Sequence, residues 1–402
     1  MDVLKAESNL QIAIPQFNIK ICLKILRATG SWPPENSGFF RYLFYAYSLC
    51  IYSFTLGSFI VAEIVNVIFN YNDLGKIASG GPLFLTNLLH SYKCFILFRN
   101  HGKLQKLLAI VDSPIFAENN FRYKNIISWY SYQGIVHHIF YQLITVITIV
   151  LWACTPIHAI LKGEEKKLPL DGWYPYDLSN SLNFIFTWSQ QAIAILLCSI
   201  NNIATDSFII GLLNVASCQF ELLKWNISSF GNCNESQEVN QEDNGINEKL
   251  RRCIQHNLAI FEFIEEIRSV FSTVISFQLI FNSLVICLST YSVSQMPSSE
   301  FVGIIGQSAY IIAMAYQILI YCWHGNELTL QNESLATAIY LGNWWKMNSR
   351  IKRDLQFIMI RTRKPLIITT RFLIKLTVET FMSIMQTSYS MYALLRRKNI
   401  EV

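Results

Sequence analysis

The chain has 402 residues, of which 52% are hydrophobic and only 15% are charged, and its net charge is +5. Soluble proteins carry about 25% charged residues, so this chain has more apolar side chains than one soluble core of its size would bury. The excess must face lipid or pack inside a helix bundle. The basic residues are scattered and not interleaved with aromatics, which argues against a nucleic-acid-binding surface.

Seven segments have the length and apolar character of membrane-spanning helices, which need roughly 20 predominantly apolar residues. In chain order they cover residues 42–67, 77–98, 140–160, 182–203, 271–291, 301–323 and 366–395. We therefore predict an all-α membrane protein with seven transmembrane helices.

Apolar stripes at helical spacing continue beyond three of these spans. They predict that the fourth and fifth spans project from the membrane as amphipathic helices, and that another helix follows the sixth. The polar residues 231–245 between the fourth and fifth spans are typical of a disordered loop. The stripes consist of Phe208, Leu212, Val215 and Leu222; Leu250, Ile254, Leu258, Phe261 and Ile267; and Ile351, Leu355 and Ile358.

The distribution of basic residues predicts the orientation, because cytosolic loops collect Lys and Arg. With a cytosolic N-terminus, the three extracellular loops contain only Lys76, Lys162, Lys166 and Lys167 of the 32 basic residues. An odd number of spans then places the C-terminus outside. The resulting divisions are a cytosolic N-terminal segment (1–38), spans one to four (39–203), cytosolic helical extensions with the loop (204–270), spans five and six (271–323), a cytosolic helical region (324–365), and span seven with a short extracellular tail (366–402).

No enzyme signature is present. The chain lacks a P-loop, an HExxH motif, a GxSxG motif and a glycine-rich dinucleotide turn. Its ten cysteines form no CxxC pair, and adjacent His137 and His138 point in different directions on a helix. We expect a non-enzymatic protein without a metal or cofactor, in which the two histidines are satisfied by hydrogen bonds.

Charged residues inside the predicted spans are rare and costly. Lys93 and Glu63 lie near span ends, which favours side chains that reach the membrane interface. Arg371, Lys375 and Glu379 recur at i, i+4 and i+8, which predicts one helical face. That face is either a wet stretch before the true span or the entrance to a conduction path, and the sequence leaves both interpretations open.

The last predicted helix combines hydroxyl and apolar residues. Thr387, Met391 and Leu394 share one face, and Arg397 follows about one turn beyond Leu394. Small hydroxyl residues in a spanning helix either pack against neighbouring helices or line a pore. Both alternatives remain.

Several motifs together resemble those of insect odorant receptors. The segment 387–397 (Thr-Ser-Tyr-Ser-Met-Tyr-Ala-Leu-Leu-Arg-Arg) is similar to the C-terminal signature of that family. Residues 321–328 (Tyr-Cys-Trp-His-Gly-Asn-Glu-Leu), the pair Trp344 and Trp345, Asp206, and the loop 168–175 match in order and spacing. The resemblance covers nearly the whole chain.

The resemblance implies an odorant-gated, non-selective cation channel, in which this chain is the tuning subunit. The channel would be a heterotetramer with the odorant co-receptor, in the plasma membrane of olfactory sensory neurons. It implies that the seventh segment is split: its cytosolic half joins the cytosolic ends of the fourth to sixth spans in a central anchor, and its membrane half lines the pore. Thr387, Met391, Leu394 and Arg397 would then line the pore, with Leu394 near the constriction.

The resemblance also implies an apolar odorant pocket in the outer half of the bundle, and a volatile ligand needs an enclosed, mostly apolar cavity. Ordinary helix packing explains the same side chains, so each remains a candidate, and Trp152 is the strongest of them. The candidates are Ile149, Trp152, Phe186, Ser189 and Tyr310, with Leu88 and Ser91 as a floor.

Two other functions are compatible with a polytopic helical protein. A gustatory-type receptor channel works without the co-receptor, but the ending from Tyr389 onward departs from the motif usual in that branch. A transporter commonly has internal repeats, and no repeat relates the two halves of this chain.

Overall fold

The computed structural model describes residues 17–34, 38–69, 71–72, 74–116, 123–161, 168–170, 172–228, 239–297, 300–362, 366, 368–372 and 374–400. These residues are almost entirely helical, and the only β pairing among them is an isolated bridge between Thr369 and Lys375. The predicted all-α class is therefore confirmed. The helices are α2 (Phe17–Ala28), α3 (Phe39–Tyr52), the π-helix η1 (Ser53–Gly57), α4 (Ser58–Phe69), α5 (Leu74–Arg99), α6 (His101–Val111), α7 (Lys124–Leu161), α8 (Ser181–Ser228), α9 (Val239–Gln295), α10 (Phe301–Leu341), the 3-10 helix η3 (Trp344–Lys346), α11 (Ser349–Thr362) and α12 (Val378–Ile400).

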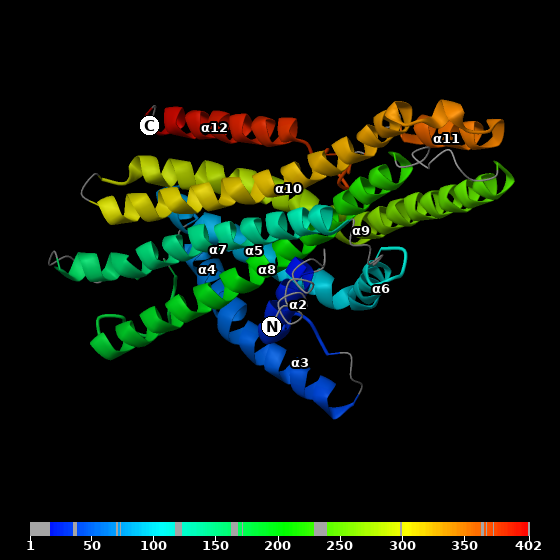
Figure 1. The fold of residues 1–402 in the computed structure, drawn as a ribbon. Helices are drawn as coiled ribbons and strands as arrows, with labels where there is room; N and C mark the ends of the chain where they lie inside the picture. Colours follow the sequence, from blue (N-terminus) through cyan, green and yellow to red (C-terminus); the bar gives the residue numbers. More distant parts are fainter. Residues whose placement is uncertain are drawn as a thin grey trace, which may run out of the picture.

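Five of the described helical stretches are long and apolar enough to cross a membrane. They are 39–69 (α3, η1 and α4), α7, α8, α9 and α10. With α5 and α12 they form a seven-membered bundle, in which the 39–69 stretch crosses the other helices obliquely (Figure 1). Large apolar side chains on the outside of α3, such as Phe39, Tyr42 and Leu49, are at least two-thirds exposed, as expected where a helix faces lipid.

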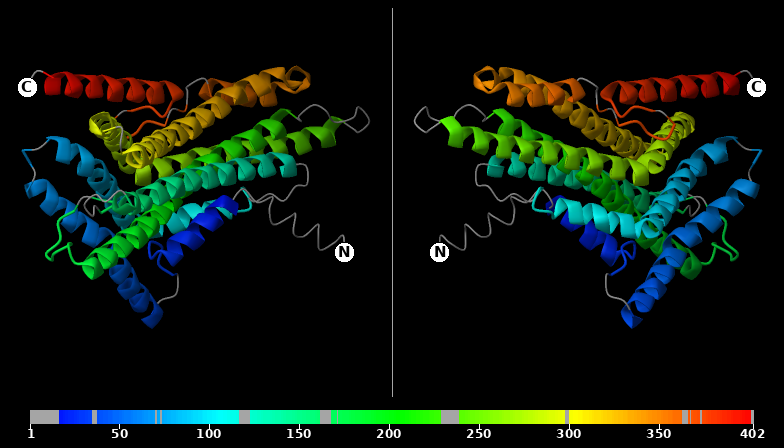
Figure 2. Two further views of the ribbon diagram at one scale, coloured as in Figure 1. Left: turned by 90° about the vertical axis from the view of Figure 1, so that its left-hand side faces the viewer. Right: turned by 90° about the vertical axis from the view of Figure 1, so that its right-hand side faces the viewer.

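The bundle has two distinct ends. The C-terminal ends of α7, α9 and α12 and the N-terminal ends of α8 and α10 lie at one end, which we call the loop end (Figure 1). The C-terminal part of α8, the N-terminal part of α9, the C-terminal part of α10, and α11 extend together at the other, which we call the α11 end (Figures 1 and 2). This grouping agrees with the predicted alternation of spans.

The amphipathic extensions are continuous with their spans. α8 and α9 run without a break through residues 204–228 and 247–270, and nearly every residue of α8 from Asn201 to Phe220 is buried. Ile351, Leu355 and Ile358 of α11 are also buried. Among the residues of the three predicted stripes, Leu258 is the clear exception to the expected burial, since it is 63% exposed.

The segment 231–245 was predicted to be a disordered loop. α9 already begins at Val239, so that prediction is wrong for residues 239–245, while residues 231–238 lie outside the described part. The repeated Asn, Gln, Glu and Asp residues gave the segment its loop-like composition, but Glu and Gln are also good helix formers.

The seventh predicted span is a helix only from Val378 onward. Before it, the chain folds back on itself, with the amide of Thr370 donating to Ile374 O at 2.9 Å and the amide of Leu376 donating to Ile368 O at 3.0 Å. Arg371 lies in the turn and Lys375 in the returning arm, so the predicted common face with Glu379 is wrong. The run Ile-Ile-Thr-Thr at 367–370 is β-branched, which disfavours helix.

This hairpin rests directly against α10 at Gly325. A Cβ built at Gly325 would overlap the Cβ of Leu376 and would lie 2.8 Å from its carbonyl oxygen. Leu376 itself is fully buried. Gly325 is therefore the position that lets the hairpin, and α12 after it, dock on the bundle.

Candidate functional site: two adjoining cavities

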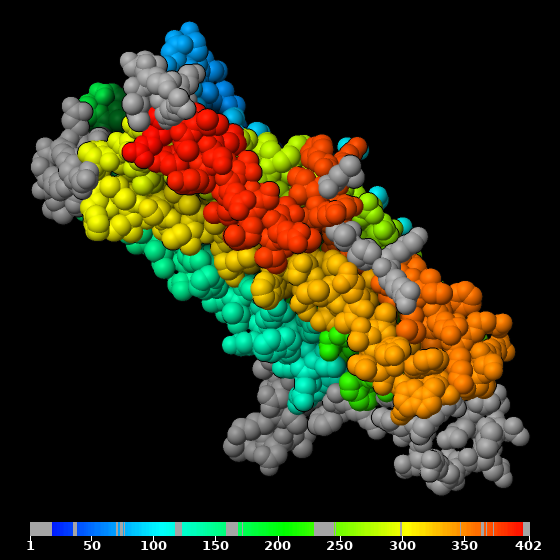
Figure 3. All heavy atoms as spheres, turned by 90° about the horizontal axis from the view of Figure 1, so that it is seen from above, coloured from blue at the N-terminus to red at the C-terminus, as the bar shows by residue number. Residues whose placement is uncertain are grey.

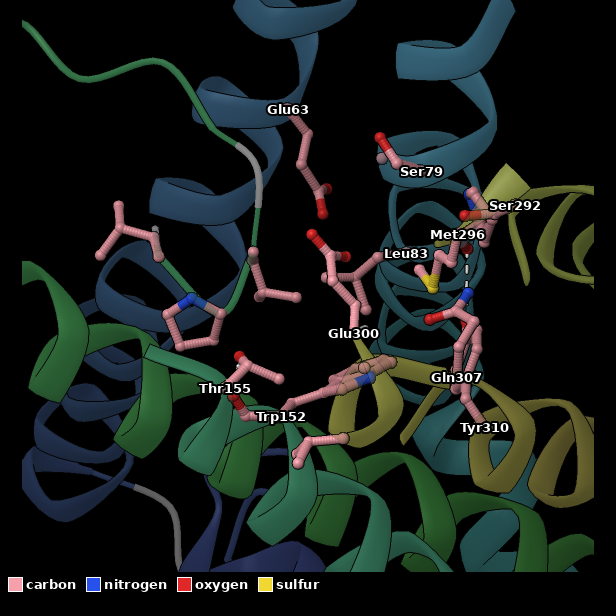
Figure 4. A pocket seen from close by; sticks show the side chains of 17 residues that line it. Glu63, Ser79, Leu83, Trp152, Thr155, Ser292, Met296, Glu300, Gln307 and Tyr310 are labelled. Carbon is pink, nitrogen blue, oxygen red and sulfur yellow. Dashed lines mark hydrogen bonds between the residues drawn. The ribbon is translucent and has the colours of Figure 1, made fainter. Parts of the chain in front are cut away.

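A cavity of about 220 Å³ opens between the helices near the loop end (Figure 4). Its walls come from α4, α5, α7, α9 and α10 and from the segment 168–170 before α8. Most of the side chains are apolar or small, and Glu63 and Glu300 are the charged ones. We call this the outer cavity; its residues are Glu63, Ser79, Gly80, Pro82, Leu83, Trp152, Thr155, Leu168, Pro169, Leu170, Ser292, Met296, Glu300, Val302, Gly303, Gln307 and Tyr310.

A second, smaller cavity of about 70 Å³ lies deeper in the bundle, and we call it the inner cavity. It shares Leu83, Trp152 and Tyr310 with the outer cavity. Its remaining walls are Phe59, Thr86, Asn87, His90, Tyr141, Thr145, Thr148, Ile149, Ile195, Cys198, Ser199, Asn202, Ile203, Ala313 and Met314.

Trp152 and Tyr310 separate the two cavities. Their ring centroids are 5.1 Å apart, and the Tyr310 hydroxyl pairs with Thr86 Oγ1 at 2.6 Å. Thr86 also donates to the Pro82 carbonyl at 3.0 Å. The tyrosine hydroxyl is thus satisfied on α5, which fixes its ring beside the indole.

Helical periodicity explains why these residues meet. On α5, Leu83, Thr86, Asn87 and His90 follow the i, i+3, i+4, i+7 pattern and form one inward face. On α7, Thr145, Thr148, Ile149 and Trp152 do the same. The cavity lies where these two faces meet α8 and α10.

Three of the seven predicted pocket residues line these cavities: Trp152, Ile149 and Tyr310. Leu88, Ser91, Phe186 and Ser189 line neither. Leu88 is 41% exposed and Phe186 is 67% exposed, and the Ser91 and Ser189 hydroxyls donate to carbonyls of their own helices. On α5 the prediction chose a neighbouring face, and on α8 it chose residues two turns too close to the loop end.

Glu63 was missed as a cavity residue. It was expected to reach the interface, but its side chain is 5% exposed and accepts hydrogen bonds from Asn87 Nδ2 at 3.2 and 3.3 Å. That prediction is wrong, because Glu63 lies on the inward face of α4 toward α5. A signal for this site was present on α5, where Thr86, Asn87 and His90 share one face of an apolar segment. That pattern predicts polar groups pointing into the bundle, one of which, Asn87, is the partner of Glu63.

Lys93 likewise does not extend to an interface. It is 1% exposed, and its Nζ donates to Asp206 Oδ1 at 2.5 Å and to Asn202 Oδ1 at 3.0 Å. Asp206 also accepts from Tyr321 at 2.8 Å and from Gln317. The prediction was wrong because it did not take into account the ion-pair partner Asp206, which lies 113 residues away in the sequence.

This polar cluster continues toward α12. Asn282 donates to Gln317 Oε1 at 2.8 Å, and the next residue, Ser283, pairs with Ser388 of α12 at 3.0 Å. His137 and His138 are also satisfied, by Tyr316 at 2.7 Å and Ser207 at 2.9 Å, as expected from the sequence.

The predicted pore face of α12 points away from the bundle. Phe381, Ile384 and Met385 pack toward the core, while Thr387, Met391 and Leu394 are exposed, Leu394 by 69%. Figure 3 shows α12 lying on the surface of the molecule. The side chain of Arg397 lies outside the described part.

Comparison with known families separates the alternatives left by the sequence. The family model described as 7tm Odorant receptor matches residues 73–389 of the 402. The chain belongs to the odorant receptor family. This favours an odorant receptor over the gustatory-type receptor and the transporter considered above.

Full-length relatives of this odorant receptor support the assignment. Odorant receptor Or1 of Anopheles gambiae is 23% identical, over 95% of this chain and 94% of the relative. Odorant receptor 33b of Drosophila melanogaster is also 23% identical, over 81% of this chain and 84% of the relative.

Solved structures share the fold of this odorant receptor. The insect olfactory receptor OR5 from Machilis hrabei, in complex with eugenol, superposes with a TM-score of 0.80 at 17% identity, over 94% of this chain and 97% of that one. The structure of the same receptor described without eugenol gives 0.79 at 16% identity. The seven-helix architecture is therefore that of an insect odorant receptor, in a multi-pass membrane protein.

Proposed function

We propose that this odorant receptor is the odorant-binding subunit of an odorant-gated, non-selective cation channel. It would form a heterotetramer with the odorant co-receptor in the plasma membrane of olfactory sensory neurons and act in the sense of smell. The observation that carries the proposal is the pair of adjoining cavities inside the bundle, lined mainly by apolar and aromatic side chains. A receptor of the same fold is known in complex with eugenol.

We further propose that the α11 end is cytosolic and the loop end is extracellular. The concentration of Lys and Arg in segments that reach the α11 end supports this orientation. Under this proposal, 204–270 and 324–365 form the cytosolic anchor, and α12 from Val378 onward forms the seventh span.

Trp152→Ala should change the odorant response when the receptor is co-expressed with the co-receptor. The indole forms part of the wall of both cavities and contacts Tyr310, so its loss removes ligand contact and joins the two spaces. We expect concentrations for half-maximal response to shift by about tenfold or more, equivalent to about 1.4 kcal/mol, measured under voltage clamp on an odorant panel.

Trp129→Ala is the matched control, because Trp129 lies on the same helix but is 63% exposed and lines neither cavity. Surface expression and currents evoked by a co-receptor agonist should stay near the parent level in both variants. If Trp152→Ala left every odorant response unchanged, the indole would be a packing residue and the proposed pocket would be wrong.

We propose that Thr387, Met391 and Leu394 line the conduction path, with Arg397 at its extracellular mouth. Their exposed face on α12 supports this. Cysteines at these three positions should react with membrane-impermeant thiol reagents applied outside, mainly while odorant is present, and the current should fall.

Ser388→Cys is the matched control within the same helix, because Ser388 is 1% exposed and faces Ser283. It should stay unreactive, and so should Glu248→Cys at the proposed cytosolic end. The parent chain measures the background from Cys50 and Cys154, which are exposed. Three inert cysteines in the open state would contradict the pore assignment, and labelling at Glu248→Cys in intact cells would contradict the orientation.

A further inference from the structure

The outer cavity contains a buried carboxylate, that of Glu63, with no cationic partner among the described residues. The Glu63 side chain is 5% exposed, and the hydrogen bonds it accepts come from the amide of Asn87, at 3.2 and 3.3 Å. Within the described residues, the cavity wall includes no Lys, Arg or His. Two long hydrogen bonds from a neutral amide offset only part of the free-energy cost of burying a carboxylate.

The side chain of Glu63 points into the open space of the cavity (Figure 4). Glu300, at the N-cap of α10, approaches from the other side, and the two carboxylates point toward each other. Any group placed between them therefore meets negatively charged or hydrogen-bond-accepting oxygens on two walls.

The rest of the cavity fits a small organic body. Trp152 and Tyr310 present aromatic rings below the carboxylates, and Leu83 and Met296 supply apolar surface. Aromatic faces attract ammonium groups within about 6 Å. The volume of about 220 Å³ exceeds that of an engineered cavity of about 150 Å³ that binds benzene, so a molecule with a single ring and a short chain has enough room.

We propose that the outer cavity binds volatile amines in their protonated form, with the ammonium group paired to Glu63 and the apolar body against Trp152 and Leu83. The inference rests on the proposed function, because it names the ligand class of that pocket. The competing state is a Glu63 that carries a proton, which would donate a hydrogen bond to a neutral ligand and would not favour amines.

The test compares 2-phenylethylamine with 2-phenylethanol, a neutral molecule of nearly the same shape, on the receptor co-expressed with the co-receptor. The amine should be more potent on the parent chain. Glu63→Gln should weaken the amine response by tenfold or more, because a charge-assisted hydrogen bond becomes a neutral one, and should shift the alcohol response by less than threefold.

Two further variants keep the result interpretable. Glu63→Asp retains the charge and should preserve the preference for the amine, and Glu265→Gln, an exposed glutamate of α9, should change nothing. If Glu63→Gln lowers surface expression, the purified receptor–co-receptor complex gives a second measurement, in which the amine should raise the unfolding temperature of the parent complex more than the alcohol does.

The proposal is overturned if amine and alcohol act equally on the parent chain, or if Glu63→Gln weakens both by the same factor. It is also overturned if neutral volatiles activate the channel and the amine does not. Failure of the channel function itself looks different: a co-receptor agonist evokes current, and no volatile of any class does.

Discussion

Lys93→Met should destabilise the folded receptor by about 3–5 kcal/mol, the cost of leaving one partner of a buried ion pair without the other. Asp206 would keep its negative charge at a fully buried position, with Tyr321 and Gln317 as its remaining partners. We expect near-complete loss of surface expression, measured by labelling intact cells, and a lower unfolding temperature of the purified protein.

The double variant Lys93→Met with Asp206→Asn provides the internal test. It removes both charges and keeps an acceptor oxygen for Tyr321, so it should be more stable than either single variant. Arg252→Met is the matched surface control, because its partner Glu248 lies 2.7 Å away, close to the 2.5 Å of the buried pair, but both side chains are about two-thirds exposed or more. It should behave like the parent. Normal expression of Lys93→Met alone would mean that the pair does not hold the bundle together.

Gly325→Ala should abolish odorant-evoked current while the helical content stays near that of the parent. The added methyl group would overlap Leu376 and approach its backbone carbonyl to 2.8 Å, and backbone cannot move aside as a flexible side chain can. The hairpin before α12 must therefore leave its site, and α12 shifts with it.

Circular dichroism and current recording after co-expression separate this local effect from global unfolding. Gly102→Ala, in α6, is the matched control, since a Cβ there meets no atom within 4 Å apart from its chain neighbours and the nearby backbone of its own helix, and alanine is a better helix former than glycine. A Gly325→Ala receptor with normal currents would show that the hairpin adjusts without cost and that its docking does not position α12.

The helices were predictable because lipid imposes a long apolar run on each span. The extensions of α8 and α9 and the helix α11 were predictable from their apolar periodicity, as Phe208, Leu212 and Ile351 illustrate. The start of α12 was not, because charge spacing at Arg371, Lys375 and Glu379 fits a helix as well as a hairpin. The contact between Gly325 and Leu376 favours the hairpin. It is a tertiary contact between residues far apart in the sequence, so charge spacing does not show it.

The site was only partly predictable for a related reason. Trp152 and Tyr310 stand out as large aromatics in apolar helices, whereas the sequence does not show whether the face of α5 with Leu88 or the face with Thr86 points into the bundle. The burial of Lys93 and Glu63 depends on Asp206 and Asn87, which belong to other helices. A rule based on distance from a span end describes an isolated helix and misses partners that the bundle supplies.

None of the described residues that line the two cavities lies on α12. A mutation in a cavity wall therefore leaves the exposed side of that helix unaltered. If the cavities bind the odorant and α12 meets the neighbouring chains, as proposed, a duplicated gene can change which volatile its product recognises, step by step, without a matching change in those chains. This separation gives receptors with little sequence in common a physical route to diverge in ligand while they keep one architecture.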